Sequence, residues 1–138
     1  MKRREFLKAT ALLTGSLAMG LHTRAHAAQG IDMPGIIYTE KNQGKWAGKA
    51  ASHAPKVSLD GRKVTIRTMH PMTEKHFIVR HTLVTEKGTV IGEKVFYPTD
   101  KEAVSTFDID YEASGYKGKL YATSFCNLHD LWVTEFSV

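Results

Sequence analysis

The sequence has 138 residues, of which 24% are charged and 42% are hydrophobic, and its formal net charge at pH 7 is +5. Five of the 19 basic residues but only one of the 14 acidic residues lie within residues 1–27, so the remainder carries 14 basic and 13 acidic side chains. This nearly neutral remainder argues against nucleic-acid binding and against binding to a membrane surface. Its length of about 110 residues fits one domain with a modest core.

Residues 1–28 have the pattern of an export signal. A cationic head precedes an apolar run at residues 9–21, and Ala25-His26-Ala27 has the small-x-small pattern cut by signal peptidase. The apolar run is shorter than the ~20 residues of a comfortable transmembrane helix. We therefore expect cleavage after Ala27 or Ala28, with no stable membrane insertion afterwards.

The route of export is indicated by the head of this segment. Arg3 and Arg4 are adjacent and are followed by Phe6-Leu7-Lys8, which predicts a twin-arginine signal. An ordinary secretory signal or an uncleaved anchor is the alternative. The expected location is periplasmic.

Residues 29–48 are rich in Gly, Asn, Gln and Lys and predict an irregular arm that leads into a domain at 49–138. In that domain, short segments alternate apolar and polar residues, as half-buried strands do, and Asp60-Gly61 is a strong hairpin signal. The expected strands are 56–59, 63–69, 76–84, 89–97, 103–109, 120–125 and 131–138. About seven short strands predict an all-β fold, an antiparallel immunoglobulin-like β-sandwich.

The chain has one cysteine, Cys126, so no disulfide can form within it. A lone cysteine in an oxidising compartment is unusual. It is buried and inert, paired with another chain, or held by a metal.

Metal-binding side chains gather at expected strand ends and loops. Cys126-Asn127-Leu128-His129 follows a strand, His70 and His76 flank a loop, and His53 precedes the first strand of the domain. These four histidines and one cysteine can converge at one rim of a sandwich. His81 lies five residues after His76, so on a regular strand it would point to the opposite face. We therefore interpret it as a surface or partly buried structural histidine.

The donor types narrow the choice of metal. A structural zinc takes four ligands, usually with more sulfur, and a blue-copper site would leave two histidines unused. Five nitrogen and sulfur ligands leave one octahedral position for a small molecule on iron. A thiolate opposite that position would push electron density toward the bound molecule, as in thiolate-ligated haem.

Three segments resemble the superoxide reductases, the family of desulfoferrodoxin and neelaredoxin. The segment from His70 to Ile78 resembles their His-Pro-Met-x-x-x-His-x-Ile motif, and residues 119–132 resemble their Cys-Asn-x-His-Gly-x-Trp segment. Trp46 and Ser52-His53-Ala54-Pro55 resemble the opening Trp and Glu-Lys-His-x-Pro motif. The resemblance covers roughly residues 44–138 without the four-cysteine rubredoxin-like domain of desulfoferrodoxins.

The resemblance implies an immunoglobulin-like sandwich and a mononuclear non-haem iron centre, Fe2+/Fe3+, with four equatorial histidines and an axial cysteine. Carried over position by position, the ligands are His53, His70, His76, His129 and Cys126. It also implies an enzyme that reduces superoxide by one electron to hydrogen peroxide with two protons. A small periplasmic protein would re-reduce the iron, and the sequence leaves a homo-oligomer open.

The sequence departs from the family where the family handles its substrate. Ala51 and Ser52 replace the Glu that can occupy the sixth site of ferric iron and the Lys that attracts superoxide. We therefore expect no carboxylate sixth ligand, and Lys49 is our candidate for the catalytic lysine, with Lys75 a weaker substitute. Asp130 replaces the usual Gly, a position where Asp tolerates a left-handed backbone.

Two alternatives remain at this point. A sulfur-oxidation carrier-like binding module would accommodate residues 68–72 but would explain neither the Cys126-to-His129 segment nor the spread of histidines. An iron or copper sensor or chaperone without turnover would explain the missing Glu-Lys pair.

Overall fold

The computed structural model describes residues 33, 35–110 and 117–138, so the predicted signal peptide at 1–28 lies outside the described residues. Residues 33–138 belong to one unit and residues 1–32 to another. In the described part of the chain, no helix has the length and apolar character needed to cross a membrane.

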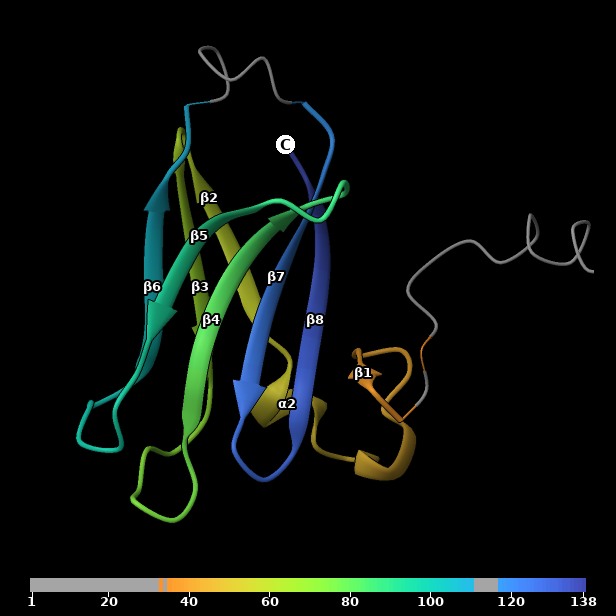
Figure 1. Cartoon of the computed structure of the whole chain (residues 1–138), viewed down its shortest axis with the longest axis vertical. Helices are drawn as coiled ribbons and strands as arrows, with labels where there is room; N and C mark the ends of the chain where they lie inside the picture. The colour runs from red at the N-terminus through yellow and green to blue at the C-terminus, as the bar shows by residue number, and fades with distance from the viewer. Residues whose placement is uncertain (1–32, 34, 111–116) are drawn as a thin grey trace, which may run out of the picture. The chain divides into compact units, whose positions relative to one another are not determined.

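Two sheets form the described unit (Figure 1). The larger sheet has the order β1-β8-β7-β4-β5 and consists of Ile37–Tyr38, Asp130–Ser137, Lys119–Cys126, Ile78–Thr85 and Val90–Val95. The smaller sheet has the order β2-β3-β6 and consists of Lys56–Asp60, Lys63–Thr68 and Ala103–Asp108. This arrangement confirms the all-β sandwich.

All seven expected strands are present, and pairing is antiparallel throughout except at one edge. The exception is β1, which pairs in parallel with β8 through Ile37 and Tyr38. This strand lies within the segment expected to be an irregular arm. The same segment contains a 3-10 turn, Gly44–Trp46, and leads into a one-turn helix, α2, Ala50–His53.

The core follows from strand alternation. In β3, Val64 and Ile66 are fully buried while their neighbours are not, and they pack with Leu83, Leu120 and Ala122 of the larger sheet. Such alternation is typical of strands with one face on a core. The apolar faces of the two sheets therefore bind the sandwich together, and a second apolar cluster of Ile78, Phe96, Ala103 and Cys126 lies against Met72 of the loop between β3 and β4.

One end of the sandwich collects the chain segments that carry the histidines and the cysteine (Figure 1). There β3 ends, β4 begins, and the turn between β7 and β8 reverses the chain, with Ile78 paired to Cys126 and Cys126 to Asp130. Helix α2 lies at this same end. Residues far apart in sequence thus meet at one rim.

His81 is not at this rim, and its expected surface or partly buried position was wrong. Its side chain is fully buried between the sheets. The parity count from His76 does not apply, because β4 begins only at Ile78. His81 Nε2 and Nδ1 lie 2.9 Å from the hydroxyls of Thr68 and Ser105. Since Thr68 donates its own hydroxyl proton to Ser124, His81 Nε2 donates to Thr68 and Nδ1 accepts from Ser105.

This buried imidazole predicts acid sensitivity. Burial lowers the pKa of His81 to about 4, from the ordinary 6.5, with a smaller contribution from Lys94. As the pH falls from 6.5 toward 4, the unfolded chain takes up a proton at His81 that the folded chain refuses, so stability is lost across this window. The loss is at most about 3 kcal/mol.

The test is the free energy of unfolding in urea at pH 7.5 and pH 5.0 for the metal-free wild type and His81→Gln. Glutamine offers a donor and an acceptor but takes up no proton, so the variant should lose less stability on acidification. All other histidines are common to the two proteins. Equal losses would contradict the assignment of this acid sensitivity to His81.

Candidate metal centre

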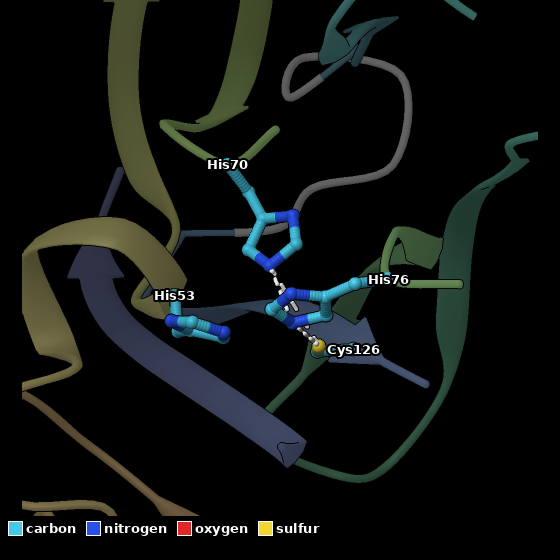
Figure 2. A group of neighbouring side chains, drawn as sticks. All are labelled: His53, His70, His76 and Cys126. Carbon is cyan, nitrogen blue, oxygen red and sulfur yellow. Dashed lines mark hydrogen bonds between the residues drawn. The ribbon is translucent and has the colours of Figure 1, made fainter. Parts of the chain in front are cut away.

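Four side chains meet at the rim of the sandwich. The ligand atoms of His53, His70, His76 and Cys126 all lie within 4.8 Å of one another (Figure 2). His53 ends α2 and Cys126 ends β7, while His70 and His76 lie on the loop between β3 and β4. Three separate segments of the chain thus supply the four side chains, and the sandwich brings these segments to one rim.

His129 is the fifth member of this group. Its Nδ1 lies 3.1 Å from Nε2 of His53, 2.9 Å from Nε2 of His76 and 3.6 Å from the sulfur of Cys126. The structure therefore brings together all five side chains predicted from the sequence. We refer to these five as the His4Cys cluster.

Hydrogen bonds behind the rings determine which nitrogen faces the cluster. His70 Nδ1 donates to the carbonyl of Pro71 at 2.5 Å. His53 Nδ1 lies 3.1 Å from the carbonyl of Lys49 and 2.8 Å from the hydroxyl of Ser52, which itself donates to that carbonyl. Both Nδ1 atoms therefore carry the proton, and both Nε2 atoms present lone pairs to the cluster.

The lone pairs stay unprotonated at neutral pH. Burial, with help from the neighbouring imidazoles, lowers the pKa of His53 to about 4, and burial also lowers the pKa of His70. Nε2 of His70 lies 2.9 Å from Nε2 of His76 and 3.8 Å from the sulfur of Cys126, so nitrogen and sulfur donor atoms crowd around one point, where a cation could be bound. The cluster therefore fits a metal ion.

Cys126 adds a sulfur ligand that a metal would activate. Its side chain is 1% exposed, and this burial raises the pKa of the thiol. Hydrogen bonds from the backbone N–H groups of Leu128 and His129 act in the opposite direction and would stabilise the thiolate. A bound cation would complete the deprotonation, because thiolates are the metal-binding form of cysteine.

Asn127 holds two of the cluster's loops together, a role that sequence reasoning missed. Its side chain accepts from the N–H of Phe77 and donates to the carbonyl of Lys75, each at 3.0 Å. Its N–H donates to the carbonyl of Phe77 at 3.2 Å. These three bonds flank His76. The Cys-Asn-x-His pattern marked the position, but nothing in the sequence indicated its partner loop.

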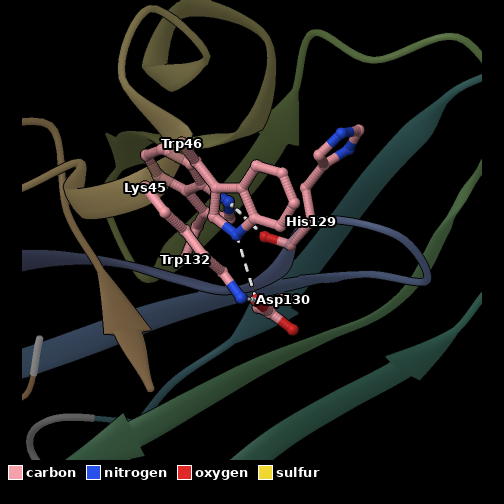
Figure 3. Close-up of polar contacts among 5 residues, drawn as sticks. All are labelled: Lys45, Trp46, His129, Asp130 and Trp132. Carbon is pink, nitrogen blue, oxygen red and sulfur yellow. Dashed lines mark hydrogen bonds and ion pairs between the residues drawn. The ribbon is translucent and has the colours of Figure 1, made fainter. Parts of the chain in front are cut away.

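The turn after His129 has the backbone that was expected. Asp130 has φ 63°, in the left-handed region, so the turn accommodates Asp where the family has Gly. The carbonyl of His129 accepts from Nε1 of Trp132 at 2.9 Å (Figure 3). The backbone of this ligand loop is thus supported from the β8 side.

Lys49 lies close enough to act electrostatically on the cluster. Its positive charge contributes to lowering the pKa of His129, after burial, and pulls down the pKa of Cys126 against the larger effect of burial. It directly precedes α2. Ser52 binds His53, and Ala51 is exposed, so neither adds a charge to the cluster.

Comparisons with known proteins give one family. The desulfoferrodoxin family model matches residues 44–135. A superoxide reductase from Giardia intestinalis is 31% identical and covers 63% of this chain and 98% of its own, with a TM-score of 0.56. A neelaredoxin from Ignicoccus hospitalis is 28% identical over 74% of this chain and 93% of its own, with a TM-score of 0.60.

A third solved structure, the superoxide reductase from Treponema pallidum, is 26% identical over 64% of this chain and 69% of its own, with a TM-score of 0.51. A search of curated proteins gave no match.

The Asn127 bridge predicts that its loss weakens metal binding more than it unfolds the protein. Asn127→Ala removes the two side-chain hydrogen bonds and should destabilise the metal-free protein by about 1–3 kcal/mol. It should also raise the dissociation constant for Fe(II) several-fold, because His76 is no longer held beside Cys126. Leu128→Ala is the matched control in the same turn, since that side chain is exposed. Equal Fe(II) affinities in the two variants would contradict this role.

Proposed function

The chain belongs to the desulfoferrodoxin family, and from this premise we propose that it reduces superoxide to hydrogen peroxide at a mononuclear iron centre held by the His4Cys cluster. The observation that carries the proposal is the convergence of four imidazole nitrogens and one thiol sulfur at one rim of the sandwich. Imidazole and thiolate together suit iron, copper and zinc. Five such donors exceed the four of a structural zinc site.

Iron in the cluster would supply the electron that superoxide takes up, and an external donor would return it. The overall conversion of superoxide to hydrogen peroxide consumes one electron and two protons. Among the chain's residues, Cys126 would donate electron density from the buried side. The histidines would fix the geometry, because their far nitrogens are tied to backbone carbonyls at His53 and His70.

Superoxide is an anion, so a positive charge near the cluster would attract it. Lys49 is the candidate, because its charge is felt at both His129 and Cys126. Lys75 is exposed beside His76 and is the weaker alternative. Asp130 opposes them with a negative charge, which Lys45 at 3.4 Å partly balances.

A sensor or chaperone for iron or copper is the second candidate function. It is favoured by Ala51 and Ser52, which supply neither a carboxylate ligand nor a cation where the family has Glu and Lys. The hydroxyl of Ser52 is engaged with His53, 2.8 Å away. The metal would then be held by the same cluster without turnover.

The compartment and the electron donor are also part of the proposal. The signal-like pattern of residues 1–28 supports export to the periplasm, by the twin-arginine route if folding and metal loading come first. Burial of the lone thiol within the cluster would shelter it from oxidation there. The donor would be a small periplasmic redox protein.

The proposal predicts a thiolate-to-Fe(III) charge-transfer band. The iron-loaded protein, once oxidised, should absorb in the visible region, and Cys126→Ala should abolish the band. Reduced protein mixed with superoxide should gain the band and lose it again when a reductant is added. A band that superoxide does not produce would favour the sensor or chaperone. Full absorbance in Cys126→Ala would refute Cys126 as a ligand.

Steering by Lys49 predicts a salt-dependent rate. Lys49→Ala should lower the second-order rate of reaction with superoxide about two- to five-fold at low ionic strength and flatten its dependence on salt. Lys87→Ala is the matched control, because it removes the same charge from the turn at the opposite end of β4. An unchanged rate and salt dependence in Lys49→Ala would remove Lys49 from the mechanism.

A further inference from the structure

Asp130 has an unusual backbone for its side chain. Among the described residues other than glycine, it is the one with a positive φ, 63°. Glycine adopts this conformation more readily than a residue with a Cβ.

The carboxylate of Asp130 links two distant segments (Figure 3). It accepts a hydrogen bond from Nε1 of Trp46 at 3.0 Å, across 84 residues of sequence. It also lies 3.4 Å from Nζ of Lys45. The turn between β7 and β8 is thereby tied to the 3-10 turn Gly44–Trp46, which precedes the helix that carries His53.

Trp46 in turn contacts a member of the cluster. The centroids of the Trp46 and His129 rings lie 4.6 Å apart, with the ring planes at 86°. This edge-to-face arrangement is favourable between aromatic rings and restricts rotation of the imidazole. Trp46 is therefore placed to determine how His129 faces the cluster.

His129 lacks a support that two of its neighbours have. The far nitrogens of His53 and His70 are bound to carbonyls, whereas the far nitrogen of His129, Nε2, has no hydrogen-bond partner among the residues that the structure describes. Its backbone is held through Trp132, but this leaves rotation of the side chain free. Within the cluster, the His129 ring contacts His53 and His76, and Trp46 adds a contact from outside the cluster.

We propose that Asp130 is a positioning residue for the metal centre, which holds the indole of Trp46 against His129 and so orients this ligand. The inference rests on the function proposed above only for the identity of the metal. Lys45 contributes little, since both partners of that ion pair are more than 40% exposed. The hydrogen bond to Trp46 is the essential contact.

The competing explanation is that Asp130 merely occupies the turn. Asp130→Gly distinguishes a positioning role from mere occupation of the turn. Glycine suits φ 63° and should keep or raise thermal stability, while the carboxylate is removed. Asp130→Asn keeps an oxygen that can accept from Trp46 and is the matched control. Trp46→Phe keeps an aromatic edge but removes the N–H. Lys45→Gln removes the ion pair and the contact of Lys45 Nζ with the Trp46 ring, 4.9 Å from its centroid, but keeps the hydrogen bond from Trp46 to Asp130.

Two measurements test this proposal, one on the iron-loaded protein and one on the metal-free protein. In the iron-loaded protein, Asp130→Gly should shift the thiolate-to-Fe(III) band and speed iron release to a chelator about three- to ten-fold. Trp46→Phe should do the same, and the double variant should be no worse than either single variant. Asp130→Asn and Lys45→Gln should resemble the wild type.

In the metal-free protein, acrylamide quenching of tryptophan fluorescence reports mainly on Trp46, because Trp132 is fully buried. Quenching should rise in Asp130→Gly and stay near the wild-type value in Asp130→Asn. If the wild type shows no iron band, the proposed function fails, and this measurement alone decides the role of Asp130. Unchanged quenching in Asp130→Gly, or equal changes in the Gly and Asn variants, would overturn the proposal.

Discussion

Two hydrogen bonds from histidine rings to backbone carbonyls determine which donor atoms this rim of the structure offers to a metal. His53 and His70 donate hydrogen bonds from Nδ1 to the carbonyls of Lys49 and Pro71, so their Nε2 atoms carry no proton and face the cluster. Burial keeps them neutral by lowering their pKa values. Without a cation, these nitrogens meet other nitrogens and a buried sulfur. The backbone carbonyls of a turn and a loop thus decide the chemistry of the cluster before any metal arrives.

The two sheets supply the rigidity that this arrangement needs. Val64 and Ile66 of one sheet pack against Leu83 and Leu120 of the other, well away from the cluster. Between the sheets, His81 joins hydroxyls from three other strands, so the centre of the sandwich contains a satisfied polar network. Strand ends that leave such a core have little freedom. Short loops are then sufficient to bring ligands from distant parts of the chain to one point.

The sequence predicted the strands and the convergence of the five cluster side chains at one rim, because alternation of apolar residues and histidines at strand ends are visible in the sequence itself. It was wrong about His81, since the start of β4 at Ile78 broke the parity count. It missed β1, a two-residue strand too short to show a period, and the bridge made by Asn127, whose partners lie about 50 residues away. Contacts between loops depend on the folded geometry and leave no local pattern.

The separation of core and cluster has a consequence for how the protein is made and maintained. Small zinc domains fold only when the metal binds, so for them folding and loading are one event. Here the apolar cluster around Val64, Ile66 and Leu83 contains no member of the His4Cys cluster, whereas Cys126 packs in a second apolar cluster with Ile78, Phe96 and Ala103. Packing of the two sheets around Val64 and Ile66 therefore does not require the metal. Folded metal-free protein and folded metal-loaded protein would then be two separate populations. Under the function proposed above, the supply of iron as well as the stability of the fold would set the fraction of active molecules.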